Sequence, residues 1–171
     1  LLLGAQYDFS KKNAFEYMKS VLLHEITHIL VFSPSLYSYY KGYSTVTQRG
    51  YIRNRTSTFL ITPKVVEAAR KHFNCSTLIG VELEDQGGSG TAGAHWEART
   101  MLGEYMIATV YGETVISEMT LALFEDSGWY KVNYYSGGLF RYGKNQGCYF
   151  LNQKCVTNGK SNFKEFCTTL D

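Results

Sequence analysis

The sequence predicts an α+β fold, and the spacing of its apolar residues supports this in two ways. Apolar residues recur at helical spacing over positions 12–31, and helical patterns also cover 65–73 and 117–126. Shorter apolar runs at 59–61 and 78–83 are typical of strands. With 171 residues, of which 44% are hydrophobic, the chain can bury one sizeable core, so one domain is the default expectation.

Capping and turn residues set the expected ends of these helices. Ser33-Pro34 is a stop signal after the first helix. Thr62-Pro63 offers the second helix an N-cap and a proline at its first position. Gly128 is placed to cap the C-terminal end of the third helix. The three helices are therefore bounded by local signals.

Three other segments are predicted to be irregular. The stretch 34–54 is rich in Ser, Tyr, Gly and Thr, which predicts a surface loop that includes a short hairpin. Residues 86–90 form a glycine-rich loop that leads to His95. Beyond Trp129, the chain is rich in Tyr, Gly and Asn and holds three of its four cysteines, which predicts an irregular tail stapled by disulfides.

The overall charge and hydropathy exclude two classes of protein. The formal net charge is +2, from 17 basic and 15 acidic residues scattered without long runs, so the sequence lacks the basic footprint of a nucleic-acid binder. No stretch approaches the roughly 20 apolar residues that a membrane span needs. The chain starts at Leu1 without an initiator Met, and we interpret it as a fragment.

The cysteines and two sequons favour an oxidising compartment. The four cysteines have irregular spacings and no C-x-x-C pair, so disulfides are a better interpretation than a metal cluster. The N-glycosylation sequons Asn54-Arg55-Thr56 and Asn74-Cys75-Ser76 agree with an extracellular or cell-surface setting.

The strongest motif is His24-Glu25-Ile26-Thr27-His28, an H-E-x-x-H pattern inside the first predicted helix. The i, i+4 spacing places both imidazole rings on one helix face, where their nitrogens can bind one ion. Glu25 is suited to accept a proton from a metal-activated water. The motif predicts one catalytic Zn²⁺ ion and the hydrolysis of peptide bonds.

Catalytic zinc normally takes three protein ligands, so one more ligand must come from elsewhere in the chain. His95 follows the glycine-rich loop, whereas His72 lies inside a predicted amphipathic helix, where a packing role is expected. His95 is therefore the preferred third ligand. The carboxylates that remain as alternatives are those of Glu82, Glu84, Glu97 and Glu104.

Several separated stretches together resemble a known family. They are 24–33, Cys75-Ser76-Thr77-Leu78, 82–88, Gly93-Ala94-His95-Trp96-Glu97, Glu104-Tyr105-Met106, 119–130 and Gly147-Cys148-Tyr149-Phe150-Leu151. In these stretches the chain resembles leishmanolysin, a surface metallopeptidase family within the metzincins. The resemblance runs from about residue 20 to the end.

The resemblance implies a role for several individual residues. His95 would be the third zinc ligand, and Met106 would be the Met-turn methionine, which lies beneath the metal without binding it. Cys75 would pair with Cys148, whereas Cys155 and Cys167 would pair with residues beyond this chain.

The resemblance also implies a domain organisation and a setting. Residues 1–130 would be a partial metzincin-like catalytic domain that lacks most of its N-terminal subdomain, and 131–171 would start a cysteine-containing C-terminal region. The substrates would be proteins or peptides, and membrane association would come from segments outside this chain.

One position departs from the metzincin pattern. Those enzymes have a glycine three residues after the second histidine, where the chain turns sharply, and this sequence has Val31. Because a β-branched residue disfavours positive φ, we expect either a helix that continues to Phe32 or a strained turn. This motivates an alternative to the zinc endopeptidase, namely a cell-surface binding protein that keeps the fold with impaired catalysis.

Overall fold

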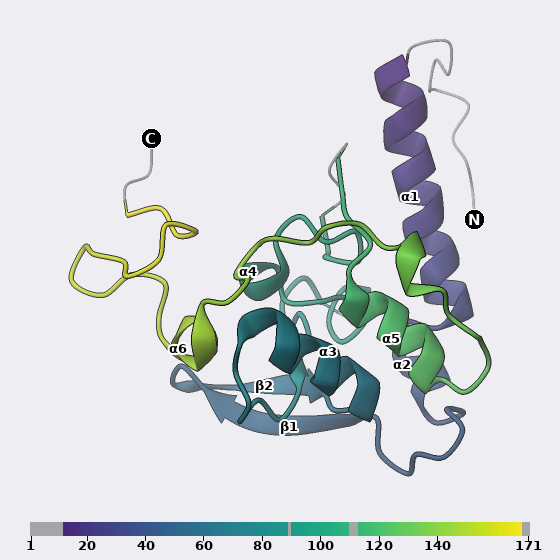
Figure 1. Cartoon of the computed structure of the whole chain (residues 1–171), viewed down its shortest axis with the longest axis horizontal. Coiled ribbons are helices and arrows are strands. Elements are labelled where there is room, and N and C mark those ends of the chain that lie inside the picture. Colours follow the sequence, from purple (N-terminus) through teal and green to yellow (C-terminus); the bar gives the residue numbers. More distant parts are fainter. Residues whose placement is uncertain (1–11, 89, 110–112, 169–171) are drawn as a thin grey trace.

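A computed structural model describes residues 12–88, 90–109 and 113–168 (Figure 1). Its described elements combine helices of different lengths with one small antiparallel sheet, so the predicted α+β class is confirmed. In chain order they are α1 (Lys12–Leu30), α2 (Pro34–Tyr37), β1 (Thr47–Ile52), β2 (Arg55–Leu60), α3 (Pro63–Phe73), β3 (Val81–Glu82), α4 (Ala98–Met101), α5 (Glu118–Asp126), the 3-10 helix η1 (Tyr134–Ser136) and α6 (Gly147–Asn152).

The sheet has the order β1-β2-β3, and both strand pairs are antiparallel. Strands β1 and β2 form a hairpin in which Ile52 is paired with Arg55. The two residues between them, Arg53 and Asn54, have φ values of 49° and 64°. Positive φ at both central positions is the geometry of a type I′ turn, which matches the twist of the adjoining strands.

The core lies where α3, α5 and the sheet meet. Helices α3 and α5 pack together, and Figure 1 shows α3 between the sheet and α5. The side chains of Phe73, Trp96 and Leu123 are almost fully buried there. This core holds the segment around Trp96 in place, and His95 directly precedes that residue.

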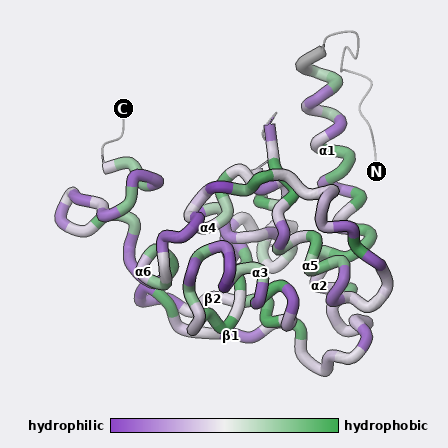
Figure 2. Tube along the Cα trace, in the orientation of Figure 1, coloured by the Kyte–Doolittle hydropathy of each residue, from purple (hydrophilic) through white to green (hydrophobic). Residues whose placement is uncertain are grey.

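Helix α1 joins this body at its C-terminal end, and its N-terminal half projects away (Figure 1). Figure 2 shows hydrophobic residues along the projecting part, where Phe15 is 51% exposed, and Ile29 in the last turn of the helix is 67% exposed. His24 and Thr27, by contrast, are buried against the body. Among the described residues, no helix is both long enough and apolar enough to cross a membrane.

Several short elements differ from the sequence prediction. The stretch 34–54, expected to be loop with a short hairpin, contains α2 and all of β1, and the strand expected at 59–61 is the end of the longer β2. The strand expected at 78–83 is regular only at Val81–Glu82. Strand β1 lies at the sheet edge and has no buried residue, so its apolar alternation is weak. Helices α4 and α6 have four and six residues, too few for a helical period to be recognised.

The end of α1 differs from both expectations for Val31. The helix ends at Leu30, and the backbone N–H groups of Val31 and Phe32 both donate to the carbonyl of Thr27, at 2.9 Å each. Val31 is not among the described residues with positive φ, and its side chain is fully buried. The chain thus leaves the helix by widening its last turn, without a left-handed residue.

This geometry predicts that Val31→Gly destabilises the full-length protein by about 2–4 kcal/mol, because it removes a fully buried side chain and frees the backbone. Denaturant unfolding of the variant measures the loss. Val31→Ala is the control that isolates the side-chain contribution, and its loss should be smaller. A Val31→Gly protein at least as stable as the parent would show that the buried Val31 side chain does not stabilise this turn.

A disulfide fastens the C-terminal segment to the core. Cys75, which follows α3, is bonded to Cys148 in α6, and this is the pair that the family resemblance implies. The bond closes a loop with a sequence separation of 73, which in the chain-entropy model is worth about 4 kcal/mol. Cys155 and Cys167 have free thiols in this structure, so their predicted pairing outside the chain stays a prediction.

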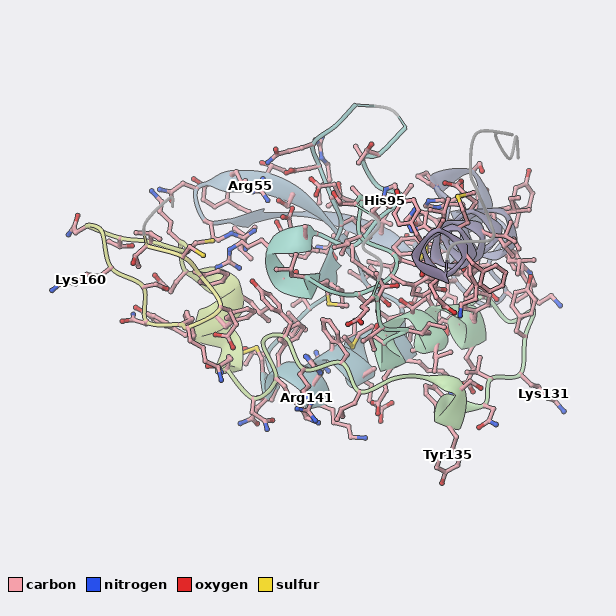
Figure 3. The ribbon with its side chains drawn as sticks, turned by 90° about the horizontal axis from the view of Figure 1, so that it is seen from above. Arg55, His95, Lys131, Tyr135, Arg141 and Lys160 are labelled. Atoms are coloured by element: carbon pink, nitrogen blue, oxygen red, sulfur yellow. A yellow bond between two sulfur atoms is a disulfide. The ribbon has the colours of Figure 1, made fainter. Side chains whose placement is uncertain are left out.

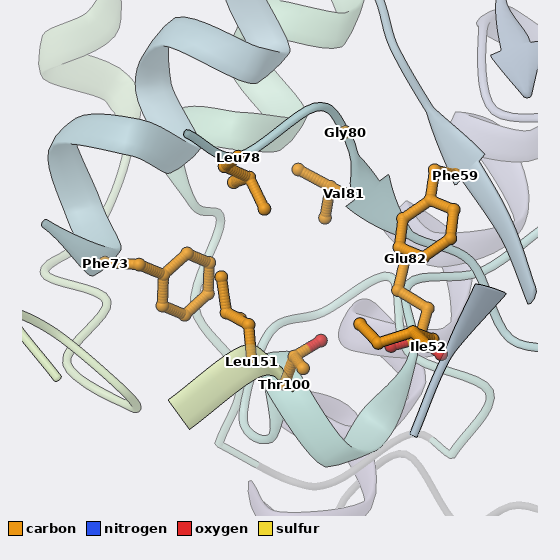
Figure 4. A pocket seen from close by; sticks show the side chains of 9 residues that line it. All are labelled: Ile52, Phe59, Phe73, Leu78, Gly80, Val81, Glu82, Thr100 and Leu151. Carbon is orange, nitrogen blue, oxygen red and sulfur yellow. The ribbon is translucent and has the colours of Figure 1, made fainter. Parts of the chain in front are cut away.

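A small pocket lies between the sheet, α3 and α6 (Figure 4). Its lining includes Phe59, Phe73 and Leu151 and is apolar except at Glu82 and Thr100. None of the three candidate metal-binding histidines lines it, so the pocket is separate from the candidate metal centre.

Candidate metal centre

The side chains of His24, His28 and His95 meet at one point. His24 and His28 come from successive turns of α1, and Figure 3 shows His95 beside that helix, which is seen nearly end-on. The three Nε2 atoms lie 3.0 Å (His24 to His28), 3.1 Å (His24 to His95) and 3.2 Å (His28 to His95) apart. The structure thus joins residues separated by 66 positions, from 29 to 94, in the sequence.

The other ring nitrogen of each histidine faces a backbone carbonyl. The acceptors are the carbonyl oxygens of Tyr105 for His24 (2.7 Å), Phe32 for His28 (2.8 Å) and Thr91 for His95 (2.8 Å). A carbonyl can only accept, so these contacts assign the proton to Nδ1 in each ring. Each Nε2 then presents a lone pair to the common centre.

Burial favours the neutral form of two of these rings. Desolvation lowers the pKa of His24 and lowers that of His95 to about 4, against the carbonyl hydrogen bonds, which raise both. Three neutral imidazoles with converging lone pairs are a donor set for a cation. A tetrahedral zinc ion about 2.0–2.1 Å from each nitrogen would set the N···N distances near 3.3 Å, so the observed spacing fits such an ion.

Glu25 lies on α1 between the two helical histidines in sequence. Its side chain is half-buried, whereas His24 is buried. The helix directs Glu25 away from the ring face that His24 and His28 share, because successive residues are about 100° apart around the axis. Glu25 is therefore not a member of the three-histidine cluster.

The segment 104–106 fixes both α1 and the neighbour of His95. Tyr105 contacts α1 twice, through its carbonyl to His24 and through its hydroxyl, 2.8 Å from the hydroxyl of Thr27. Met106, the expected Met-turn residue, is fully buried, and its carbonyl accepts the backbone N–H of Trp96 at 3.0 Å. This segment holds the histidines from both sides of the cluster.

A buried carboxylate organises this segment. Burial raises the pKa of Glu104 to about 7, against the hydrogen bonds that it accepts, which lower it. The donors are the backbone N–H groups of Met106 (2.6 Å) and Ser117 (3.1 Å) and the hydroxyls of Ser117 (3.0 Å) and Thr120 (2.5 Å). Thr120 in turn accepts the indole N–H of Trp96 at 2.9 Å. Glu104 thereby links the Met106 segment, α5 and the residue next to His95.

The remaining candidate ligands lie elsewhere or have other partners. His72 contacts the carbonyl of Tyr142 at 2.8 Å and stacks on Phe140. The carboxylate of Glu82 accepts from Arg53, Arg55 and Ser57, and that of Glu97 accepts from Arg55 and from the backbone of Arg99. Glu84 accepts the backbone N–H groups of the next two residues.

The acidic side chains of Glu84, Asp85 and Glu97 form a second cluster in which a cation already takes part. Their oxygens lie within 4.8 Å of one another. Arg55 pairs with Asp85 at 3.0 Å and with Glu97 at 3.1 Å. Arg55 thus bridges two of the three carboxylates, and the third, that of Glu84, accepts backbone N–H groups, so partners from the protein already satisfy this cluster.

The motif does not identify the groups that orient the rings. Backbone carbonyls such as those of Thr91 and Phe32 have no signature in a sequence, because every residue has one. Tyr105 lies inside one of the family-like stretches, and that stretch is the one signal that could have pointed to it.

Comparison with known proteins agrees with this geometry. The leishmanolysin family model, peptidase family M8, matches residues 5–171. A leishmanolysin-like peptidase of Drosophila melanogaster is 35% identical over 85% of this chain and 27% of its own length. A leishmanolysin homolog of Crithidia fasciculata is 38% identical over 85% of this chain and 22% of its own. Leishmanolysin of Leishmania tropica is 31% identical over 86% of this chain and 22% of its own.

The chain thus spans about a quarter of the length of these curated relatives, and the match covers the three histidines, the Met106 segment and the disulfide. Because the family model covers nearly the whole chain, the chain belongs to the leishmanolysin family of metallopeptidases.

Proposed function

We propose that this chain is the zinc-binding part of an endopeptidase that hydrolyses peptide bonds in proteins or peptides. The observation that carries the proposal is the convergence of three Nε2 atoms, 3.0–3.2 Å apart, at a helix that also carries Glu25. His24, His28 and His95 are the proposed ligands. Three protein ligands leave one position for water or substrate, which is the ligand count of catalytic rather than structural zinc.

The proposed mechanism divides the chemistry between the ion and the chain. Zinc held by these histidines would polarise the scissile carbonyl and lower the pKa of the attacking water towards about 7. Glu25 accepts the proton of that water as it attacks and then donates it to the leaving amine. The carbonyls of Tyr105, Phe32 and Thr91 keep the rings oriented, and the carbonyl of Met106 fixes Trp96, the residue after His95.

We also propose an extracellular or cell-surface location. The Cys75–Cys148 disulfide supports it, because such bonds persist in oxidising compartments. Any membrane association would depend on segments outside this chain.

Casein cleavage by the full-length protein tests the proposed activity. Cleavage should stop when a chelator removes the metal and return when zinc is added back, because the histidines alone hold no electrophile. The measurement is the rate before chelation, after chelation and after zinc is restored. A folded, zinc-loaded protein that does not cleave casein or gelatin would favour the alternative, a surface binding protein with impaired catalysis.

A further inference from the structure

The tip of the β1–β2 hairpin carries an N-x-T sequon on an exposed turn. Asn54 is the second residue of the two-residue turn, and its side chain is exposed. Thr56, which completes the sequon, is exposed on β2 opposite Tyr51. Both residues that a glycosylating enzyme must recognise are therefore on the surface.

The other turn residue fixes this tip to the body. The side chain of Arg53 is 6% exposed, donates to both carboxylate oxygens of Glu82 at 2.6 Å and donates to the carbonyl of Leu151 at 2.6 Å. The two central residues of the turn thus have opposite environments. Arg53 anchors the hairpin, and Asn54 is left free for solvent.

An open hollow of about 630 Å³ lies beside Asn54, between the hairpin tip and the segment that follows α6. Tyr51 and Asn54 line one side, and residues 152–154 with Thr157 line the other. Figure 1 shows the hairpin tip next to α6. The volume lies within the range of about 300–1,000 Å³ typical of small-ligand sites.

Tyr51 supplies an apolar surface in this hollow. Its side chain is 75% exposed, so its ring is available to a neighbouring group. An aromatic ring with a polar hydroxyl suits the face of a sugar, whose axial C–H groups are apolar and whose edge is polar. The lining therefore matches carbohydrate better than a purely apolar ligand.

We propose that Asn54 is an N-glycosylation site and that the first sugar lies in this hollow against Tyr51. The amide nitrogen of Asn54 forms a bond to the anomeric carbon of an oligosaccharide carried on a polyisoprenoid pyrophosphate. The bond from that carbon to the pyrophosphate oxygen breaks, the pyrophosphate takes the electron pair, and the amide loses one proton. The proposal rests on the extracellular location proposed above.

The second sequon provides an internal comparison. Asn74 has a φ of 56° and ends α3, and its neighbour Cys75 is buried in the disulfide with Cys148. Asn74 does not line the hollow beside Tyr51. Removing this sequon should leave Asn54 unaffected.

Glycopeptide mass spectrometry of the secreted full-length protein tests the site. Enzymatic deglycosylation in heavy-oxygen water should convert Asn54 to labelled Asp in most chains. Thr56→Ala should abolish the label, and the matched Thr56→Ser, which keeps the sequon, should retain it. Asn74→Gln should leave the label at Asn54 unchanged.

Thermal unfolding tests whether the first sugar lies against Tyr51. Deglycosylation should lower the Tm of the parent protein and should lower that of Tyr51→Ala clearly less. Equal shifts in the two proteins would overturn the contact with Tyr51.

Finding Asn54 without a sugar would overturn the proposed glycosylation site. This holds whether the secreted protein has the Cys75–Cys148 disulfide or has both cysteines reduced. Casein cleavage by the same preparation keeps the two proposals apart. If the protein cleaves casein but Asn54 has no sugar, only the glycosylation proposal is overturned. If Asn54 is glycosylated but casein is not cleaved, only the peptidase proposal is overturned.

Discussion

Glu25→Gln in the full-length protein is expected to lower kcat for peptide hydrolysis by about 100- to 10,000-fold, with zinc still bound. Gln has nearly the size of Glu but cannot accept a proton at neutral pH, so the attacking water loses its base. The side chain of Glu25 is half-buried and lies outside the histidine cluster, so the metal ligands keep their positions. Steady-state kinetics and metal analysis by mass spectrometry measure the two quantities.

Glu16→Gln is the matched control for this substitution. Glu16 lies on the same helix, about two turns before the motif, and forms an exposed ion pair with Lys19. Its replacement should leave kcat unchanged. Near-parental activity in a zinc-loaded Glu25→Gln protein would show that another group acts as the base.

His95→Ala is expected to weaken zinc binding by more than 100-fold, because it removes one of three nitrogens at the centre. Loss of an outer-shell hydrogen-bond partner alone typically costs about 10–100-fold in metal affinity, and loss of a ligand should cost more. The structure places the Nε2 of His95 3.1 and 3.2 Å from those of His24 and His28. Competition with a chromophoric chelator measures the change in affinity.

His72→Ala controls for the loss of a partly buried imidazole. His72 contacts the carbonyl of Tyr142 and stacks on Phe140, away from the cluster, so its removal should leave zinc affinity unchanged. Full zinc stoichiometry and parental affinity in the His95→Ala protein would mean that a carboxylate completes the site. The carboxylates to examine next would then be those of Glu82, Glu84, Glu97 and Glu104.

The helical part of the site is predictable from the sequence because its geometry is local. The i, i+4 spacing of His24 and His28 fixes their common face once the helix forms, and the apolar period over 12–31 predicts the helix. The position of His95, by contrast, is not determined by residues near it in the sequence. It depends on the pairing of β3 with β2 and on the carbonyl of Met106, which receives the N–H of Trp96.

The turn after α1 shows what spacing rules leave out. Val31 suggests a longer helix or a strained turn, because such rules consider the φ preference of one residue at a time. In the structure, the helix ends because the N–H groups of two successive residues, Val31 and Phe32, share the carbonyl of Thr27. No single residue needs an unusual φ, and Val31 is buried in the core. The short helices α4 and α6 escape prediction for another reason, since contacts such as those of Arg99 with the carbonyls of Phe150 and Gln153 hold this region.

X-ray absorption spectroscopy of the zinc-loaded full-length protein tests the central claim most directly. The account predicts a first shell with three imidazole nitrogens at about 2.0–2.1 Å and one further oxygen, and the loss of one imidazole in any zinc retained by His95→Ala. A shell with only two imidazoles in the parent protein, or one that His95→Ala leaves unchanged, would contradict it.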